Sequence, residues 1–230
     1  MTAARAFVAG ATGHVGRLVV PALRERGAEV IAHVRPDSGR VDEWRARFQG
    51  ADVDTSAWEL AALTATLAAR APTHVFCLIG TTRKRASREQ VDGDPYLAID
   101  YGQCKLLVDA AVASGARPRF VLLSSVGVSP KSSSKYLHAH WLAEEAVRQS
   151  GLAWRIARPS MIGGGGRDEG RPVERAGMAV AGGLLAVAGL VAPRMKARYR
   201  PTTAEVLAIA IARVGLDDGG DRVIENEDLR

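Results

Sequence analysis

One stretch of this sequence decides the fold, Gly10-Ala11-Thr12-Gly13-His14-Val15-Gly16. It follows the apolar run 6–9 and precedes a segment, His14–Arg26, that has the apolar spacing of an amphipathic helix. Glycines in this pattern let the backbone turn tightly and approach a pyrophosphate, while the N-terminus of the following helix directs N–H groups at it. The stretch therefore predicts a dinucleotide-binding loop in which all seven residues take part.

Short apolar runs alternate with longer helix-compatible segments along the rest of the chain. The predicted strands are Ala6–Gly10, Glu29–Arg35, His74–Gly80, Arg119–Ser125 and Ala153–Pro159. The predicted helices are His14–Arg26, Ser56–Ala69, Tyr96–Ser114 and Ser134–Gln149, and Pro21 should kink the first or displace one of its hydrogen bonds. The alternation predicts an α/β chain with a doubly wound parallel sheet, a Rossmann fold.

The length of 230 residues and the hydrophobic content of 47% predict a single NAD(P)-binding domain over residues 1–230. The two cysteines, Cys77 and Cys104, form no disulfide or metal pattern, which favours a reducing, cytoplasmic setting, and no signal peptide is expected before the first strand. The net charge of +6 does not indicate nucleic acid, because the arginines are scattered and lie in no recognisable nucleic-acid module.

The segment Ala176–Ala192 is apolar but contains four glycines and is short for a bilayer span. We expect a buried or cleft-lining helix there, within a small C-terminal helical lid at 163–200 that covers the nicotinamide. Peripheral contact with a membrane surface, helped by the basic residues of 194–200, is the alternative. A homodimer also stays open, since the sequence does not fix the oligomeric state.

The end of the second predicted strand bears on the choice between NAD and NADP. NAD-preferring sites place a carboxylate there on the ribose hydroxyls, whereas an arginine suits a 2′-phosphate. This chain has Arg35, and its first carboxylate, Asp37, comes after a proline. The pattern favours NADP (NADPH) over NAD, although Arg35 could be an ordinary surface residue. Further along, Asp52 or Asp54 could bind the adenine amine, and Asp54 could instead cap a helix.

A serine pair, Ser124-Ser125, ends the fourth of these strands, and Tyr136 begins the helix that follows. Because the carboxyl ends of parallel strands face the ligand crevice, these side chains should meet there. Together with Cys77–Arg83, Leu122–Gly127, Ser132-Ser133, Tyr136-Leu137, Arg158-Pro159 and Arg167–Glu174, they resemble the atypical or extended short-chain dehydrogenase/reductase superfamily. The resemblance is closest to the Tat-interacting-protein-like oxidoreductases.

This resemblance implies a role for several residues. Tyr136 would be the proton donor or acceptor, with Ser125, or alternatively Ser124, as its partner on the substrate carbonyl. Arg158 could equally be structural. The resemblance also implies a set of residues beside the cofactor, the last two near its nicotinamide half: Gly80, Thr81, Thr82, Ile162 and Arg171.

The family pattern is broken four residues after Tyr136, where His140 replaces the expected lysine. The lysine would share the helix face of the tyrosine, hold the nicotinamide ribose, and lower the phenol pKa from about 10 by its fixed charge. A histidine, with an ordinary pKa near 6.5, is mostly neutral at pH 7, so His140 could hold a hydroxyl but supply little field. Residual activity should then favour reduction over oxidation. The neighbouring Lys135 should point away.

Two hypotheses on function follow. The leading one is an NADP-dependent oxidoreductase that reduces a small apolar carbonyl compound, its small-molecule substrate, with Tyr136 as proton donor. The alternative is a catalytically weak or inactive dinucleotide-binding sensor or scaffold, similar to NmrA-type regulators, and the loss of the lysine at His140 favours it. Separately from both hypotheses, Tyr136 and His140 could be ordinary residues of an exposed helix.

Overall fold

The computed structural model of the chain describes residues 3–81, 93–163 and 197–230. Two of the predicted cofactor residues, Thr82 and Arg171, lie outside the described residues. So do the apolar segment Ala176–Ala192 and most of the predicted lid.

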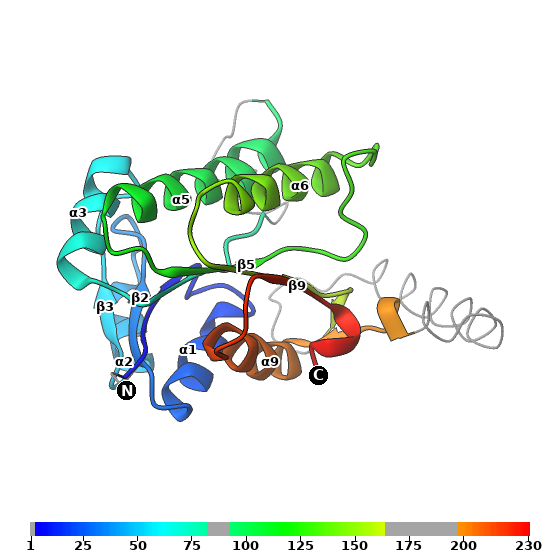
Figure 1. Ribbon diagram of the computed structural model, residues 1–230. Helices are drawn as coiled ribbons and strands as arrows, with labels where there is room; N and C mark the ends of the chain where they lie inside the picture. Colours follow the sequence, from blue (N-terminus) through cyan, green and yellow to red (C-terminus); the bar gives the residue numbers. More distant parts are fainter. Residues whose placement is uncertain (1–2, 82–92, 164–196) are drawn as a thin grey trace.

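A seven-stranded parallel sheet forms the centre of the molecule, in the order β3-β2-β1-β4-β5-β6-β9 (Figure 1). Its strands are β1 Arg5–Ala9, β2 Glu29–His33, β3 Asp52–Asp54, β4 His74–Cys77, β5 Arg119–Leu123, β6 Trp154–Arg158 and β9 Arg222–Glu225. A separate parallel pair consists of β7 Ile162–Gly163 and β8 Thr202–Thr203. The parallel sheet and its strand order confirm the predicted Rossmann fold.

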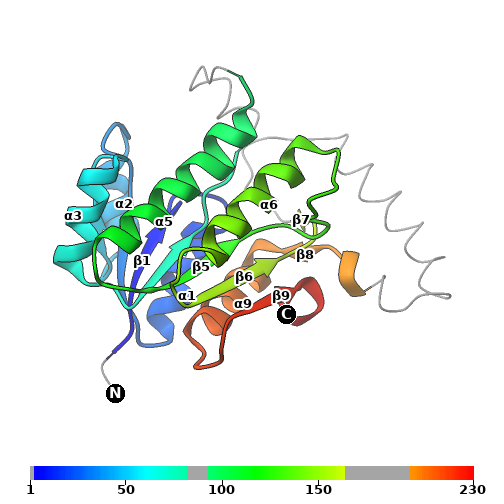
Figure 2. The ribbon, with the colours of Figure 1, turned by 45° about the horizontal axis from the view of Figure 1, so that its top comes forward.

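Helices cover both faces of this sheet (Figures 1 and 2). One face carries α1 Gly16–Glu25, α2 Val41–Arg47 and α9 Ala204–Leu216. The other carries α3 Leu60–Arg70, the π-helix η1 Tyr96–Gln103, α5 Cys104–Ala113 and α6 Lys135–Arg148, and a 3₁₀ turn, η2 Asn226–Asp228, follows β9. None of the helices in the described ranges is long and apolar enough to cross a membrane.

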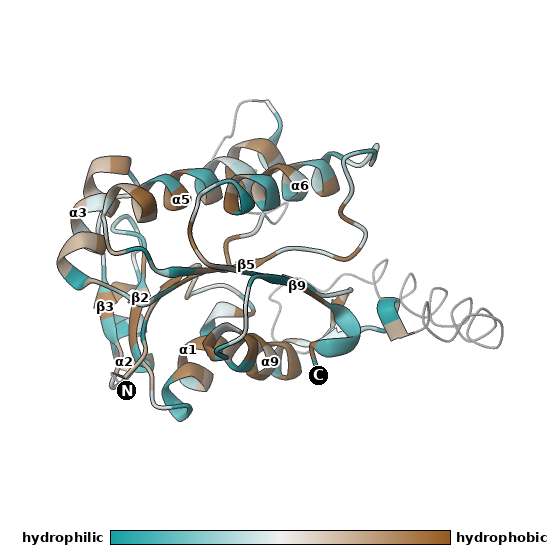
Figure 3. Cartoon of the chain, viewed as in Figure 1, coloured by the Kyte–Doolittle hydropathy of each residue, from teal (hydrophilic) through white to brown (hydrophobic). Residues whose placement is uncertain are grey.

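The two faces of the sheet give two apolar cores. Because successive strand residues point to opposite faces, Ala6 and Val8 of β1 pack with α1 and α9, whereas Phe7 and Ala9 pack with α3 and α5. All four residues are fully buried, so β1 reads as a continuous apolar run. Figure 3 shows the apolar residues concentrated on the central strands and on α9.

Two helices differ from their predictions. Helix α1 runs unbroken through Pro21, which lies on its exposed side. It begins at Gly16, so His14 belongs to the loop and not to the first helical turn. The predicted helix Tyr96–Ser114 is two elements, because its first turns are the π-helix η1.

Candidate active site

Most of the predicted site residues in the described ranges lie at the carboxyl ends of the parallel strands. Since all seven strands are parallel, their carboxyl ends lie together, and the strand order reverses between β1 and β4. Ligands of open α/β sheets bind in the crevice at such a reversal. The residues that follow these strand ends are the glycine loop after β1, Arg35 after β2, Gly80 and Thr81 after β4, Ser124 and Ser125 after β5, and Ile162 after β6.

The glycine loop is packed so closely that larger side chains would not fit. Gly10 has a φ of +79°, and an added Cβ would lie 2.7 Å from the carbonyl carbon of Leu78. A Cβ on Gly16 would collide with the Gly10 carbonyl oxygen, while Gly13 N donates to that same oxygen at 2.9 Å. Thr12 and Gly13 stay exposed just before the N-terminus of α1. This cradle fits a pyrophosphate group.

The adenosine side of the crevice is bounded by β2 and β3. Arg35 is half-buried, with its Nε 3.7 Å from Asp37 Oδ1. Asp52 lies at the amino end of β3 and forms an ion pair with Arg70 at 2.5 Å. Asp54 is at the carboxyl end and accepts a 2.6 Å hydrogen bond from Ser56. Of the two aspartates considered for the adenine, the structure thus brings Asp54, not Asp52, to the crevice edge.

Helix α6 brings Tyr136 and His140 together. It begins after Ser134, whose side chain caps it by accepting from Leu137 N. The two aromatic rings meet edge to face with centroids 4.4 Å apart, and Tyr96 of η1 packs on Tyr136 in the same way at 5.5 Å. Residues four apart share a helix face, which explains why the pair could be expected from the sequence.

His140 is buried, with 5% of its surface exposed. Its Nε2 lies 3.6 Å from Asp100 Oδ1, and in the described part of the chain no group is hydrogen-bonded to either ring nitrogen. Burial lowers the pKa of His140 below its ordinary value, although Asp100 and Glu144 act in the opposite direction. The imidazole is therefore neutral at pH 7.

Asp100 is a site residue that the sequence did not point out. It is 4% exposed and comes from the π-helix η1. Thr81 N donates to its Oδ1 at 3.2 Å, and the Thr81 hydroxyl donates to Oδ2. Asp100 thus links the loop after β4 to α6. A single acidic residue within an apolar helical run was the available signal, but its partners lie far away in the sequence.

The two serines of the pair have different surroundings. Ser124 is buried, and its hydroxyl donates to Glu144 Oε1 at 2.6 Å. Ser125 is half-buried, and its hydroxyl makes a long contact of 3.4 Å with the Val126 carbonyl. Of the two hydroxyl groups, that of Ser125 is the one more readily available to a ligand.

Glu144 is the second residue that the sequence did not reveal. Its fully buried carboxylate accepts from Arg158 at 2.8 and 2.6 Å and from Arg148 at 2.7 Å. Burial alone would raise the pKa of Glu144, but the hydrogen bonds from Arg158 and Ser124 outweigh it and hold the pKa below its usual value. Arg158 also reaches Glu225 at 3.3 Å, so it has a structural part in joining β6, β9 and α6.

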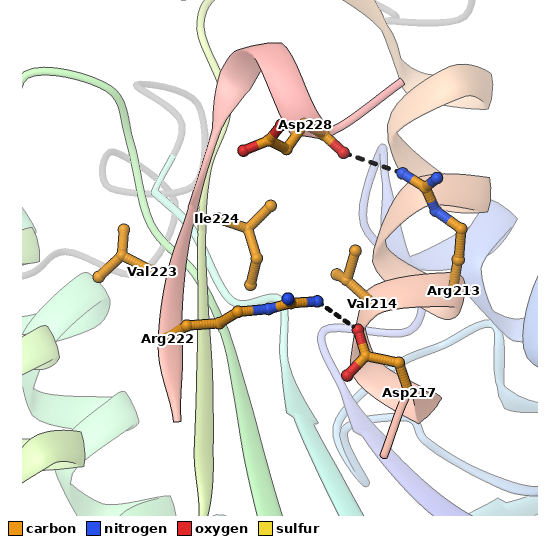
Figure 4. A pocket seen from close by; sticks show the side chains of 7 residues that line it. All are labelled: Arg213, Val214, Asp217, Arg222, Val223, Ile224 and Asp228. Atoms are coloured by element: carbon orange, nitrogen blue, oxygen red, sulfur yellow. Dashed lines mark hydrogen bonds and ion pairs between the residues drawn. The ribbon is translucent and has the colours of Figure 1, made fainter. Parts of the chain in front are cut away.

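A pocket elsewhere in the molecule lies between α9 and β9 (Figure 4). Val214 and Ile224 line it with apolar side chains, whereas Val223 points to the other side of β9 in Figure 4, and Arg222 forms an ion pair with Asp217. None of the predicted site residues lines it. Within the described ranges, moreover, no group of three His, Cys, Asp or Glu residues is placed to hold a metal ion.

The fold, the glycine loop and the crevice at the strand reversal define a nicotinamide dinucleotide-binding protein of the Rossmann class. Residues 10–187 match the family described as NAD(P)H-binding, and the chain belongs to that family. The family resemblance expected from the sequence is confirmed at this level. Membership of this family specifies a nicotinamide dinucleotide as ligand, but it does not specify whether that ligand is NAD or NADP.

Two relatives illustrate the range of the family. The chain is 31% identical over 222 residues to the mitochondrial protein fmp52-1 of Aspergillus terreus, covering 90% of this chain and 85% of the relative. It is 36% identical over 166 residues to the chloroplastic divinyl chlorophyllide a 8-vinyl-reductase of Oryza sativa subsp. indica. That match covers 67% of this chain but only 39% of the reductase.

Solved structures share the fold at lower identity. The NADPH-dependent quinone oxidoreductase of Escherichia coli, complexed with NADPH, superimposes with a TM-score of 0.62 at 18% identity, covering 96% of this chain and 68% of that chain. The Bordetella bronchiseptica enzyme WbmH, in complex with NAD+, gives a TM-score of 0.65 at 18% identity, covering 97% and 75%. These similarities establish the fold.

Proposed function

We propose that this protein is an NADPH-dependent reductase of a small apolar carbonyl compound. The observation that carries the proposal is the edge-to-face pair of Tyr136 and His140 beside the loop after β4, with Ser125 after the neighbouring strand. The site thus offers a phenol and a hydroxyl group at the same end of the parallel strands as the glycine loop. One relative is named a reductase, although its name states a vinyl group as the group reduced, so it supports reduction in general and not the carbonyl substrate.

The chemistry divides between the dinucleotide and the chain. When bound, NADPH supplies the hydride to the carbonyl carbon. The chain supplies the proton, which the Tyr136 hydroxyl donates to the carbonyl oxygen, while the Ser125 hydroxyl donates a hydrogen bond to the same oxygen. Because the buried imidazole of His140 is neutral, it does not supply the fixed positive charge of a lysine that would favour the phenolate. Tyr136 therefore serves better as an acid than as a base, and reduction is the favoured direction.

A spectrophotometric assay tests this proposal. The purified protein is incubated with NADPH and a panel of quinones, aldehydes and ketones, and the absorbance of NADPH is followed. We expect turnover with at least one apolar carbonyl compound, and the variant Tyr136→Phe should abolish it. Tyr96→Phe, which keeps the neighbouring ring but lies on η1, is the matched control and should retain it. Tight NADPH binding without any turnover would overturn the reductase proposal.

The preference for NADPH depends on Arg35 in this proposal. A guanidinium group binds a 2′-phosphate through charge-assisted hydrogen bonds, which NADH cannot make. Arg35→Ala should therefore weaken NADPH binding about tenfold or more and leave NADH within about twofold. Arg70→Ala, which removes a cation paired with Asp52 instead, is the control. Calorimetric titration gives both dissociation constants, and equal losses for the two cofactors would exclude a role in discrimination.

The second candidate function is a dinucleotide sensor that binds NADPH without chemistry. The observation in its favour is the buried, neutral His140 in the position of the expected lysine. The variant His140→Lys distinguishes the two functions. A weakened reductase should gain activity from the restored ammonium group, whereas a sensor should bind NADPH and stay inactive in both forms.

We propose a cytoplasmic location for the protein, and its two free cysteines fit a reducing compartment. The name of the fungal relative, by contrast, states a mitochondrial location. Fractionation of cells that express the full chain decides between the two compartments.

A further inference from the structure

We propose that Asp100 is a positioning residue that fixes the tautomer of His140, so that Nδ1 of the imidazole accepts a hydrogen bond from a hydroxyl group at the site. This inference rests on the proposed function for the identity of the hydroxyl group, which belongs to the dinucleotide ribose or to the alcohol product. The tautomer itself can be measured without turnover.

The first argument is the geometry of the imidazole. Nε2 of His140 lies 3.6 Å from a carboxylate oxygen of Asp100, and both side chains are almost entirely buried. A neutral imidazole has one N–H group and one lone pair. A negative charge beside Nε2 favours the proton on that nitrogen. Nδ1 then carries the lone pair.

The second argument is that Nδ1 needs a partner. It is buried, and no described residue is hydrogen-bonded to it. A buried acceptor without a partner costs free energy, which a ligand hydroxyl would offset on binding. A lysine at this position could only donate hydrogen bonds. With histidine in place of the expected lysine, position 140 therefore accepts a hydrogen bond from the ligand hydroxyl instead of donating one to it.

The third argument concerns the charges around the imidazole. The carboxylates that raise the pKa of His140 are Asp100, from η1, and Glu144, one turn further along α6. Glu144 forms ion pairs with Arg148 and Arg158. Of these two carboxylates, Asp100 is the one within 4 Å of an imidazole nitrogen, so its charge favours the proton on Nε2.

Asp100 also acts on the cofactor side. It accepts from both the N–H and the hydroxyl group of Thr81, in the loop that follows β4. One carboxylate thus holds the loop expected beside the cofactor and the imidazole on α6 in a fixed relation. The two effects can be separated, because Thr81→Val removes the hydroxyl contact but leaves the carboxylate beside His140.

Nitrogen NMR of the full chain with labelled histidine tests the inference directly. His140→Gln assigns the His140 signals among those of the five histidines. The wild-type protein should show the Nε2–H tautomer, and saturating NADP+ should shift the Nδ1 signal. In Asp100→Asn the tautomer preference should fall about tenfold, whereas Thr81→Val should leave it unchanged. An Nδ1–H tautomer in the wild type would overturn the proposal even if the Asp100 variant did not fold.

Activity gives a second, separate readout. Asp100→Asn should lower kcat about tenfold in the wild-type background and less than twofold in the His140→Gln background, because it acts through the imidazole. Equal losses in both backgrounds would contradict that route. If the wild type has no turnover at all, the reductase proposal fails, while the NMR result still decides the role of Asp100.

Discussion

Two buried polar clusters lie one turn apart along α6, and their contacts differ. In the Glu144 cluster the carboxylate is hydrogen-bonded to Ser124, Arg148 and Arg158, all at 2.8 Å or less. In the His140 cluster the imidazole is 3.6 Å from Asp100, and within the described residues neither of its nitrogens is hydrogen-bonded. The central group of each cluster is buried, with Glu144 0% and His140 5% exposed, so their difference is not one of exposure.

This difference distinguishes buried polar groups that stabilise the fold from buried polar groups that are available to a ligand. A buried charge with a complete set of hydrogen bonds holds the elements that supply them, here β5, β6 and α6. A buried imidazole whose ring nitrogens lack hydrogen-bond partners lowers the stability of the folded state in the absence of a ligand. Such a group is expected where a ligand completes the set. The Glu144 cluster should therefore control stability and the His140 cluster should control binding and turnover.

The largest expected effect is that of Glu144→Gln on stability. The change leaves Arg158 and Arg148 without their shared counter-ion in a buried position, and breaking a buried pair in this way costs about 3–5 kcal/mol. Urea unfolding measures the loss. Glu145→Gln removes a more exposed carboxylate that also pairs with Arg148, and it should cost less than about 1 kcal/mol. Equal losses for the two variants would break the comparison.

The serine pair gives the second test, with one residue in each environment. Ser125→Ala should lower kcat about a hundredfold, because it removes a donor to the carbonyl oxygen, and should leave the unfolding free energy nearly unchanged. Ser124→Ala should do the opposite and cost about 1.5–2 kcal/mol of stability through the lost bond to Glu144. Measuring kcat and unfolding on both variants checks the assignment. A catalytic loss at Ser124 alone would exchange their roles.

The parts of the molecule that could be predicted from sequence are those set by local pattern. The central strands alternate with helices at the predicted places, because short apolar runs bounded by glycine and proline specify buried parallel strands. The glycine loop after β1 could also be predicted. The packing around Gly10 and Gly16 excludes a Cβ, so glycine is required there and the pattern is visible in the sequence. Tyr136 and His140 share a face of α6 because they are four residues apart.

The remaining parts depend on contacts between distant segments. Asp100 comes near His140 only because η1 packs against α6. Glu144 binds Arg158 only because β6 brings the arginine to α6. Strand β9 is short, lies at the edge of the sheet and begins with a charged residue. Its alternation of apolar and polar residues is therefore too weak to predict a strand. The adenine-side aspartates could not be ranked either, because only the register of β3 shows which of them reaches the carboxyl edge.

The smallest expected effect is on the pH dependence of stability. The His140 cluster should affect stability in a higher pH range than the Glu144 cluster. Burial, followed by the charges of Arg119 and Arg155, lowers the pKa of His74 to about 4, and burial also lowers the pKa of His140 and His33. Between pH 6.5 and 4 the unfolded chain therefore binds protons that the folded chain does not. Stability must fall as the pH falls through this range. For His74 the loss is about 1–2 kcal/mol, since partial solvent exposure screens it.

The Glu144 cluster acts in a lower range. Because the pKa of Glu144 is lowered in the folded state, its contribution is present above pH 4.5 and is lost as the pH falls below that value. His74→Gln and His140→Gln should each flatten the unfolding free energy between pH 6.5 and 4.5, whereas Glu144→Gln should lower the whole curve there without changing its slope. Urea unfolding at a series of pH values measures both quantities. A slope that His140→Gln leaves unaltered would mean that the imidazole is protonated in the folded protein, and the contrast between the two clusters would then have to rest on hydrogen bonding alone.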